Sequence, residues 1–417
     1  MPKVHTSVQF MKEKLKIAFY TDSFLPAHDG VVSSIMALRK GLESKGHEVY
    51  IFASGNDATR KMVGHDRHII IVKGMKFRKY PQYNIALLPF STSFKLNRIR
   101  PDVIHAHTPF VMGTWALVAA KINGTPVVGT FHTIFMDRSA VEQYASKVAA
   151  GAIAKYAWEY ARFFYNRCDA VIAPSESTKE ILESKGVRNV CVAPNGVDTE
   201  RFNDHARGKA VRSRLLQNPR QKIVLYVGRM SREKKIEVLL RAARLLKDEN
   251  IFFVFVGAGP AIGHYKRQSE RLGISGKVKF VGFVEDAQLP SYYAAADLFC
   301  IPSTFETQGM VAIEAMAVGK PVVGADSLAL KEVIKSGRNG EKFRPGDSRD
   351  CAAKIKKAIN NLTSYKEMAK TANEYSVNRT TDGVLNVYYK VLRAAGQYGY
   401  DIAKGAGATR QNLKAIH

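Results

Sequence analysis

Residues 303–319 read Ser303-Thr-Phe-Glu-Thr-Gln-Gly-Met-Val-Ala-Ile-Glu-Ala-Met-Ala-Val-Gly319 and lie between two short apolar runs, 298–301 and 321–324. Short apolar runs bounded by Gly or Pro are typical of buried strands. A glycine at each end of the apolar segment marks where a helix begins and stops, at Gly309 and Gly319. The pattern therefore predicts a strand, a polar loop, a short helix and a second strand.

Two glutamates in this stretch, Glu306 in the loop and Glu314 in the helix, have seven residues between them. A helix N-terminus at the C-terminal edge of a parallel sheet presents backbone amides and a partial positive charge, which suit a phosphate. The amides of Gly309, Met310 and Val311 are the candidates for this contact. Glu314 can bind a diol such as a ribose, and Glu306 can bind hydroxyls at the other end of the ligand. The layout fits a nucleotide sugar, although a buried amphipathic helix with two chance glutamates explains the spacing equally.

Length and composition describe a globular protein with two domains. A chain of 417 residues is too long for one compact core, and 46% hydrophobic with 24% charged residues exclude a disordered chain. No apolar run approaches the roughly 20 residues that span a bilayer. The first nine residues lack the apolar core of a secretory signal, so we expect a cytoplasmic protein.

The net charge is the most unusual bulk property. It is +26, from 63 Lys and Arg against 37 Asp and Glu, which suits nucleic acid, an anionic membrane or an anionic nucleotide as partner. No nucleic-acid motif such as a zinc finger is present, so we expect no nucleic-acid partner; a generally basic surface is the alternative. The cysteines, Cys168, Cys191, Cys300 and Cys351, form no CxxC pair or histidine cluster, which indicates neither zinc nor a disulfide framework.

Strand and helix signals alternate along the chain in two series, which predicts an α/β protein with doubly wound parallel sheets. The turn-rich string 194–198 separates the series, and apolar positions within 378–392 share one helix face. We predict an N-terminal domain at 1–198, a C-terminal domain at 199–377, and a helix with a frayed tail at 378–417. The strands are expected at 14–21, 46–53, 68–72, 85–89, 102–106, 126–131, 170–173, 190–193, 222–228, 251–257, 278–282, 298–301 and 321–324.

Loops at strand ends in the first series carry polar candidates. The loop Thr21–Val32 contains Gly30, where the missing side chain lets the backbone approach a phosphate; a plain strand-to-helix turn is the alternative. His105 and His107 share one face of a strand and can both be hydrogen-bonded core histidines. As a metal pair they lack an evident third ligand. His132 ends the next strand, where a lone histidine is commonly structural.

One loop in the second series contains both an arginine and a lysine that can bind phosphate, Arg229 and Lys234. The run Val227–Lys234 follows a strand, and its Arg229 can hold two phosphate oxygens while Lys234 adds a point charge. A solvated basic helix start is the alternative. The loop 282–286, which contains Val284, ends another strand of this series.

Five motifs, in this order, resemble those of the family-4 retaining glycosyltransferases, which have the two-domain GT-B fold. The resemblance covers about residues 14–392. It implies two Rossmann-like domains facing each other across a deep cleft, with the C-terminal helix crossing back to the N-terminal domain. The motifs are DxFxPxxxGV at 22–31, HxH at 105–107, TFHT at 130–133, GRxxxEK at 228–234 and ExxxxxxxE at 306–314.

This resemblance implies a role for each candidate. His132 and Glu306 are the residues expected to carry the chemistry, because their counterparts lie at the transferred sugar. Arg229 and Lys234 are expected to hold the donor diphosphate. The remaining donor contacts are expected at Gly30, Val284, Gly309, Met310, Val311 and Glu314, and His107 is expected on the acceptor side.

Other features bear on the acceptor. The match departs at Lys235, where the family usually has Gly. The sequence Glu306-Thr-Gln-Gly309 resembles the one found in the branch of diacylglycerol glycosyltransferases and phosphatidylinositol mannosyltransferases. Basic and aromatic residues interleave at 73–80 and 149–167, which suits an anionic bilayer surface, although the second stretch can equally be a core helix.

We therefore expect a retaining hexosyltransferase that moves a hexose from UDP- or GDP-hexose to a membrane lipid at the inner face of the cell membrane. No cofactor or bound metal is expected, because Arg229, Lys234 and the helix amides would stabilise the leaving diphosphate. The alternatives are transfer to a soluble sugar phosphate or glycan, a phosphorylase or epimerase of the same fold, and a nucleic-acid-binding protein. The sequence does not identify the hexose, the base, the lipid or the oligomeric state.

Overall fold

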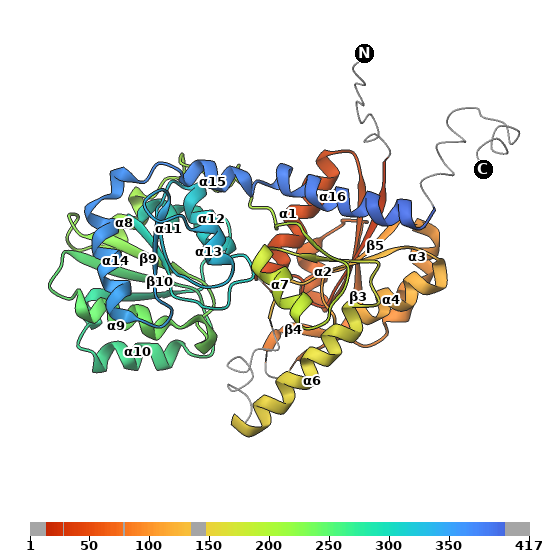
Figure 1. The fold of residues 1–417 in the computed structure, drawn as a ribbon, viewed down its shortest axis with the longest axis horizontal. Helices are drawn as coiled ribbons and strands as arrows, with labels where there is room; N and C mark the ends of the chain where they lie inside the picture. The colour runs from red at the N-terminus through yellow and green to blue at the C-terminus, as the bar shows by residue number, and fades with distance from the viewer. Residues whose placement is uncertain (1–13, 28, 78–79, 135–146, 397–417) are drawn as a thin grey trace, which may run out of the picture. The chain divides into compact units, whose positions relative to one another are not determined.

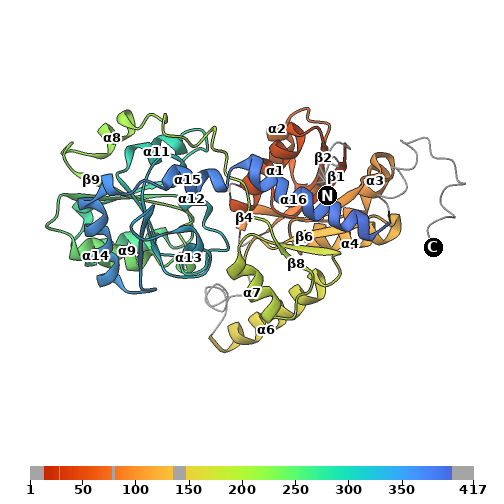
Figure 2. The same ribbon diagram turned by 45° about the horizontal axis from the view of Figure 1, so that its top comes forward.

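The computed structural model describes residues 14–27, 29–77, 80–134 and 147–396 and contains two sheets (Figures 1 and 2). The first sheet has the order β4-β3-β2-β1-β5-β6-β7-β8. The pairings from β3 through β6 are parallel, and the edge strand β4 pairs antiparallel with β3. Its strands are β1 Lys16–Thr21, β2 Glu48–Gly55, β3 Ile69–Phe77, β4 Tyr80–Ala86, β5 Val103–Ala106, β6 Val127–Thr130, β7 Ala170–Ala173 and β8 Val190–Val192.

The second sheet has the order β11-β10-β9-β12-β13-β14, and all of its pairings are parallel. Its central strands are nearly continuous apolar runs because helices cover both faces of such a sheet. The predicted α/β class with two parallel sheets is confirmed. The strands are β9 Lys222–Val227, β10 Ile251–Val256, β11 Val278–Gly282, β12 Leu298–Ile301, β13 Val322–Ala325 and β14 Gly340–Phe343.

Helices connect the parallel strands. The strand expected at 85–89 is wrong in its second half: β4 ends at Ala86, and Pro89 opens a 3₁₀ turn, because proline has no amide to donate to a sheet. The helices are α1 Gly30–Ser44, α2 Asp57–Val63, α3 Ser93–Ile99, α4 Val111–Asn123, α6 Lys147–Tyr165, α7 Glu176–Ser184, α8 Lys209–Leu215, α9 Ile236–Leu245, α10 Ile262–Arg271, α11 Leu289–Ala295, α12 Met310–Ala317, α13 Ala329–Val333, α14 Ser348–Asn360, α15 Met368–Glu374 and α16 Val377–Ala394; the 3₁₀ helices are η1 Pro89–Thr92, η2 Arg232–Lys234, η3 Ser275–Lys277 and η4 Leu362–Ser364.

The chain divides into two compact units. The first comprises residues 1–130, 167–171 and 385–417, and the second comprises 131–166 and 172–384. The domain boundaries at 198 and 377 stay a prediction.

In each sheet the strand order reverses beside one strand, β1 in the first and β9 in the second. Ligands of doubly wound sheets bind beyond the strand ends at this reversal, because the loops on either side part there. The loops after β1 and β5 carry Asp22 and His107, and the loops after β9 and β12 carry Arg229 and Glu306. Each sheet therefore places its candidate residues at the edge where such folds bind ligands.

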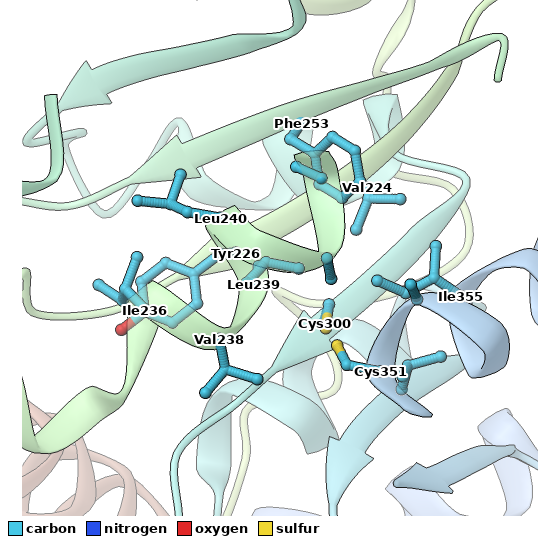
Figure 3. Packing of buried hydrophobic residues seen from close by; sticks show 14 of the residues in the cluster. Val224, Tyr226, Ile236, Val238, Leu239, Leu240, Phe253, Cys300, Cys351 and Ile355 are labelled. Atoms are coloured by element: carbon cyan, nitrogen blue, oxygen red, sulfur yellow. The ribbon is translucent and has the colours of Figure 1, made fainter. Parts of the chain in front are cut away.

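Figure 3 shows the core on one face of the second sheet, where side chains of α9 and α14 meet those of the strands. Leu239, Phe253 and Ile355 are each buried in this cluster. The sulfurs of Cys300 and Cys351 lie next to each other there, and both cysteines are free thiols. Burial raises the pKa of the Cys351 thiol well above its ordinary value, so this sulfur acts as an apolar packing group.

The C-terminal helix α16 buries the face that its apolar spacing predicts. Its part from Leu385 onward belongs to the first compact unit. There the hydroxyl of Tyr388 lies 2.6 Å from Nδ1 of His105, whose Nε2 lies 2.6 Å from Oγ1 of Thr130. His105 is thus a fully hydrogen-bonded core histidine. The predicted positions Val384, Leu385, Val387, Tyr388, Val391 and Leu392 are all buried, and so is Tyr389.

Candidate functional site

The loop after β12 leads into α12 through Gly309, which lies in the left-handed region at φ +80°. A Cβ at this position would also lie 2.7 Å from Cδ2 of Leu330, so glycine is required on both counts. No side chain of the described residues caps the N-terminus of α12. The amides of Met310 and Val311 are therefore available to a ligand, as the sequence predicts for a phosphate.

Lys234 and Glu306 form an ion pair, with Nζ 2.7 Å from Oε1. Lys234 ends η2 in the loop after β9, and Glu306 lies in the loop after β12, the neighbouring strand. Both side chains are largely buried, so water screens their attraction only partly. The structure thus brings together a residue that the sequence proposes for the diphosphate and one that it proposes for the sugar hydroxyls of the same ligand.

Arg229 follows β9 in the same loop as Lys234 and is partly buried. Its carbonyl accepts a hydrogen bond from the hydroxyl of Tyr226, at 3.1 Å, which fixes the start of the loop. The loop ends at Lys235, a left-handed residue with φ +52°. This conformation explains why a glycine is usual here in the resembled family.

Glu314 is buried on α12, where its Oε2 accepts a hydrogen bond from the Tyr293 hydroxyl at 2.7 Å. Burial raises the pKa of Glu314 to about 7, while the Tyr293 hydrogen bond and the Arg201 charge oppose that rise. The Glu314 carboxyl group therefore changes between its protonated and ionised forms near neutral pH. Tyr293, on α11, is a partner that sequence spacing could not identify.

Hydrogen bonds of Thr307 and Gln308 hold the end of this loop in place within the second compact unit. The Thr307 hydroxyl donates to the carbonyl of His132 at 2.8 Å, and the Thr307 carbonyl accepts from Ser175 at 2.7 Å. The side chain of Gln308 accepts from the Asn195 amide and donates to the Asn195 carbonyl, at 2.7 and 2.8 Å. The Thr-Gln pair beside Glu306 thus anchors the main chain of the loop.

Val284 lies in the loop after β11, an edge strand, and packs against the apolar core of the second unit. Its predicted contact with a nucleotide base stays a prediction.

Gly30, in the first unit, is the first residue of α1, and a Cβ there would meet nothing within 4 Å. The carboxylate of Asp29 accepts hydrogen bonds from Val31 and Val32, at 2.9 and 3.0 Å. A phosphate at this helix N-terminus would therefore compete with Asp29 for those amides. His107 is buried, with its ring stacked 4.0 Å from that of His105. The roles of Gly30 and His107 remain predictions.

Asp22 was not selected from the sequence, although it begins the motif that contains Gly30. Its carboxylate accepts hydrogen bonds from the Thr108 hydroxyl at 2.6 Å and from the Met112 amide at 2.9 Å. Burial raises its pKa to about 6, and these hydrogen bonds oppose that rise. Its place directly after the strand expected at 14–21 was the available signal in the sequence.

The described residues also bear on the expectations about metal ions and membranes. They contain no group of three or more His, Cys, Asp or Glu side chains placed to hold a metal ion. Every helix among them is too short or too polar to cross a bilayer.

Family models match both halves of the chain: Glycosyltransferase Family 4 at residues 28–201 and Glycosyl transferases group 1 at residues 209–375. The alpha-monoglucosyldiacylglycerol synthase of Streptococcus pneumoniae is 28% identical, over 96% of this chain and 91% of its own. The GDP-mannose-dependent alpha-mannosyltransferase of Mycolicibacterium smegmatis is 30% identical, over 78% and 84%. HepE of Anabaena, solved with UDP and glucose, superposes with a TM-score of 0.72 at 22% identity, over 90% of this chain and 100% of its own, a likeness in fold.

Proposed function

The chain belongs to the family-4 and group 1 glycosyltransferases, has the GT-B fold and is a hexosyltransferase. We propose that it transfers a hexose from UDP- or GDP-hexose to a membrane lipid of the diacylglycerol type. We propose further that the transfer retains the configuration of the sugar. The names of two similar proteins support the lipid acceptor and the sugar-nucleotide donor of this proposal. One names a glucosyldiacylglycerol as product, and the other names GDP-mannose as donor.

The contact between Lys234 and Glu306, beside the uncapped N-terminus of α12, carries the donor half of the proposal. Arg229, Lys234 and the amides of Met310 and Val311 would bind the diphosphate. They would stabilise the charge that grows on it as the bond to the sugar breaks. This arrangement supplies positive charge without a metal ion, and we propose that none is needed.

The remaining contacts position the sugar and the nucleoside. Glu306 would bind the sugar hydroxyls after leaving Lys234, and Glu314 would accept hydrogen bonds from the ribose diol. His132 would lie at the face of the sugar that reacts. The acceptor hydroxyl would attack on the side from which the diphosphate leaves, which retains the configuration. Water must be excluded from the site, since it would otherwise hydrolyse the donor.

We place the reaction at the inner face of the cell membrane, with the protein bound peripherally. Two observations support this location: the glycolipid product named for one similar protein, and the net charge of +26, which favours an anionic leaflet. The same transfer to a soluble sugar phosphate or glycan is the second candidate, since it needs only the donor contacts.

The test incubates the purified protein with liposomes containing diacylglycerol and with radiolabelled UDP- and GDP-hexoses in turn. Label in the organic phase identifies the donor and supports a lipid acceptor. Nucleoside diphosphate release with label only in the aqueous phase contradicts it in favour of a soluble acceptor.

Site variants test the assignment of the donor contacts. Glu306→Ala and Arg229→Ala should each lower transfer at least about 100-fold while leaving the folded state intact by circular dichroism. Arg214→Ala, which removes another arginine of the second unit, from α8, is the matched control and should keep the wild-type rate. Near-normal turnover in either site variant would refute the assignment.

A further inference from the structure

Helix α6, which is labelled in Figures 1 and 2, carries a row of exposed apolar and aromatic side chains. Ile153, Tyr156, Tyr160 and Phe163 are 46%, 74%, 38% and 56% exposed. Their spacing of three, four and three residues places all four on one stripe of the helix. We call these four residues the α6 stripe.

The stripe is distinct from the face by which α6 packs. Ala161, Phe164 and Tyr165 are buried, and the ring of Trp158 stacks on Phe131 with centroids 6.2 Å apart. The helix is therefore anchored by one face and presents a second apolar face to solvent. For residues 149–167 the sequence left two alternatives open, a core helix or a membrane-binding surface. The helix has a buried face and a separate exposed apolar face.

The charged residues of α6 on the rest of its exposed surface are mainly basic. Lys155 and Arg162 are exposed, and the one acidic residue of the described helix, Glu159, forms an ion pair with Arg162. The helical period places Glu159 next to the stripe and the two basic residues farther round the helix. A stripe of two tyrosines, a phenylalanine and an isoleucine on a helix with net positive charge matches the boundary between headgroups and acyl chains of an anionic bilayer. We propose that α6 lies along the surface of such a bilayer, with the α6 stripe inserted among the headgroups.

This inference rests on the proposed lipid acceptor, and it adds the surface by which the protein meets that lipid. In sequence, α6 follows the loop of His132, the residue proposed at the reacting sugar. Because Trp158 of α6 stacks on Phe131, the residue before His132, a bilayer at α6 would lie near the proposed reacting loop.

The test compares two triple variants of the full chain by flotation with vesicles, without donor. The first, Tyr156→Ser, Tyr160→Ser and Phe163→Ser, removes the aromatic side chains of the α6 stripe. The second, Leu88→Ser, Phe90→Ser and Phe94→Ser, is the matched control, since these residues are 55%, 57% and 71% exposed at η1 and α3. Vesicles of phosphatidylcholine are used with and without phosphatidylglycerol. Because every substituted side chain is exposed, both variants should unfold at the wild-type temperature.

We expect the α6 variant to bind vesicles containing phosphatidylglycerol at least about tenfold more weakly than wild type, and the control variant to bind normally. Equal binding by the α6 variant and the wild type would overturn the proposal. Loss of binding in the η1 and α3 variant alone would also overturn it, as would a wild-type dimer in sedimentation that the α6 variant abolishes.

A separate assay distinguishes failure of this surface from failure of the proposed function. Transfer to a short-chain diacylglycerol in detergent micelles needs no bilayer, so the α6 variant should retain it. If the wild type binds vesicles through α6 but transfers no hexose to any diacylglycerol, the surface stands and the proposed acceptor is wrong.

Discussion

Replacing Glu314 with Gln is expected to change how the stability of the protein depends on pH. The folded state raises the pKa of this carboxyl group to about 7, against an ordinary value of 4.5. Between these two pH values the folded protein binds a proton that the unfolded chain does not bind. The free energy of unfolding therefore falls as pH rises through this window, and it is constant with respect to Glu314 outside it.

The difference between the two pKa values corresponds to about 3 kcal/mol. A glutamine at this position carries no charge at any pH, and its side-chain carbonyl still accepts the hydrogen bond from Tyr293. Relative to the wild type, Glu314→Gln should therefore gain about 3 kcal/mol of stability between about pH 4.5 and pH 8. Asp22 and the other ionisable groups titrate in both proteins, so this comparison cancels their contributions.

Urea unfolding followed by circular dichroism measures the difference. Unfolding curves of the wild type and Glu314→Gln are recorded at about pH 5, 6, 7 and 8, and the free energies of unfolding are subtracted at each pH. Glu285→Gln, in an exposed loop, is the matched control. If the difference between Glu314→Gln and the wild type is the same at every pH, the raised pKa of Glu314 is refuted.

Other predictions concern stability. Lys235→Gly should raise the free energy of unfolding by roughly 1 kcal/mol because φ is +52°, whereas Lys235→Ala should not. Tyr388→Phe should cost about 1–3 kcal/mol by removing the buried hydrogen bond between Nδ1 of His105 and the Tyr388 hydroxyl, while the bond from Nε2 to Thr130 remains. Leu239→Ala should cost about 2–5 kcal/mol, and the exposed Leu245→Ala far less. Urea unfolding measures all of these changes. Equal midpoints for Lys235→Gly and Lys235→Ala, for Leu239→Ala and Leu245→Ala, or for Tyr388→Phe and the wild type would contradict the reason given for that change.

The sequence predicts the strands well because a strand buried on both faces is a run of apolar residues. The runs at 222–228, 251–257 and 298–301 correspond to β9, β10 and β12 within one or two residues. The second half of the strand expected at 85–89 is wrong because its apolar residues, Leu87 and Leu88, are exposed and lie after the end of β4, in the turn before Pro89. Hydrophobicity alone does not separate such exposed residues from a buried edge strand.

The candidate site is predictable where a residue's role depends on its own loop. Gly309 is an example, since a glycine before an apolar helix signals the left-handed turn that the structure contains. Contacts between distant loops are not predictable in this way. Glu306 and Lys234 are 72 residues apart, and Tyr293 and Glu314 are 21 apart. No periodicity in the sequence links them, because the strand order of the sheet sets these distances.

With the proposed donor contacts, the ion pair between Lys234 and Glu306 would make ligand binding an exchange of counter-ions. Lys234 is already paired with a carboxylate in the free protein, so an arriving diphosphate would replace one anion with another. The displaced carboxylate then needs new hydrogen-bond donors, because a largely buried charge without a partner is costly. A ligand with hydroxyls next to its diphosphate supplies those donors, whereas free diphosphate supplies none. Under the proposed function, the pair would thus favour sugar nucleotides over inorganic diphosphate, even though both carry the charge that Lys234 is proposed to bind.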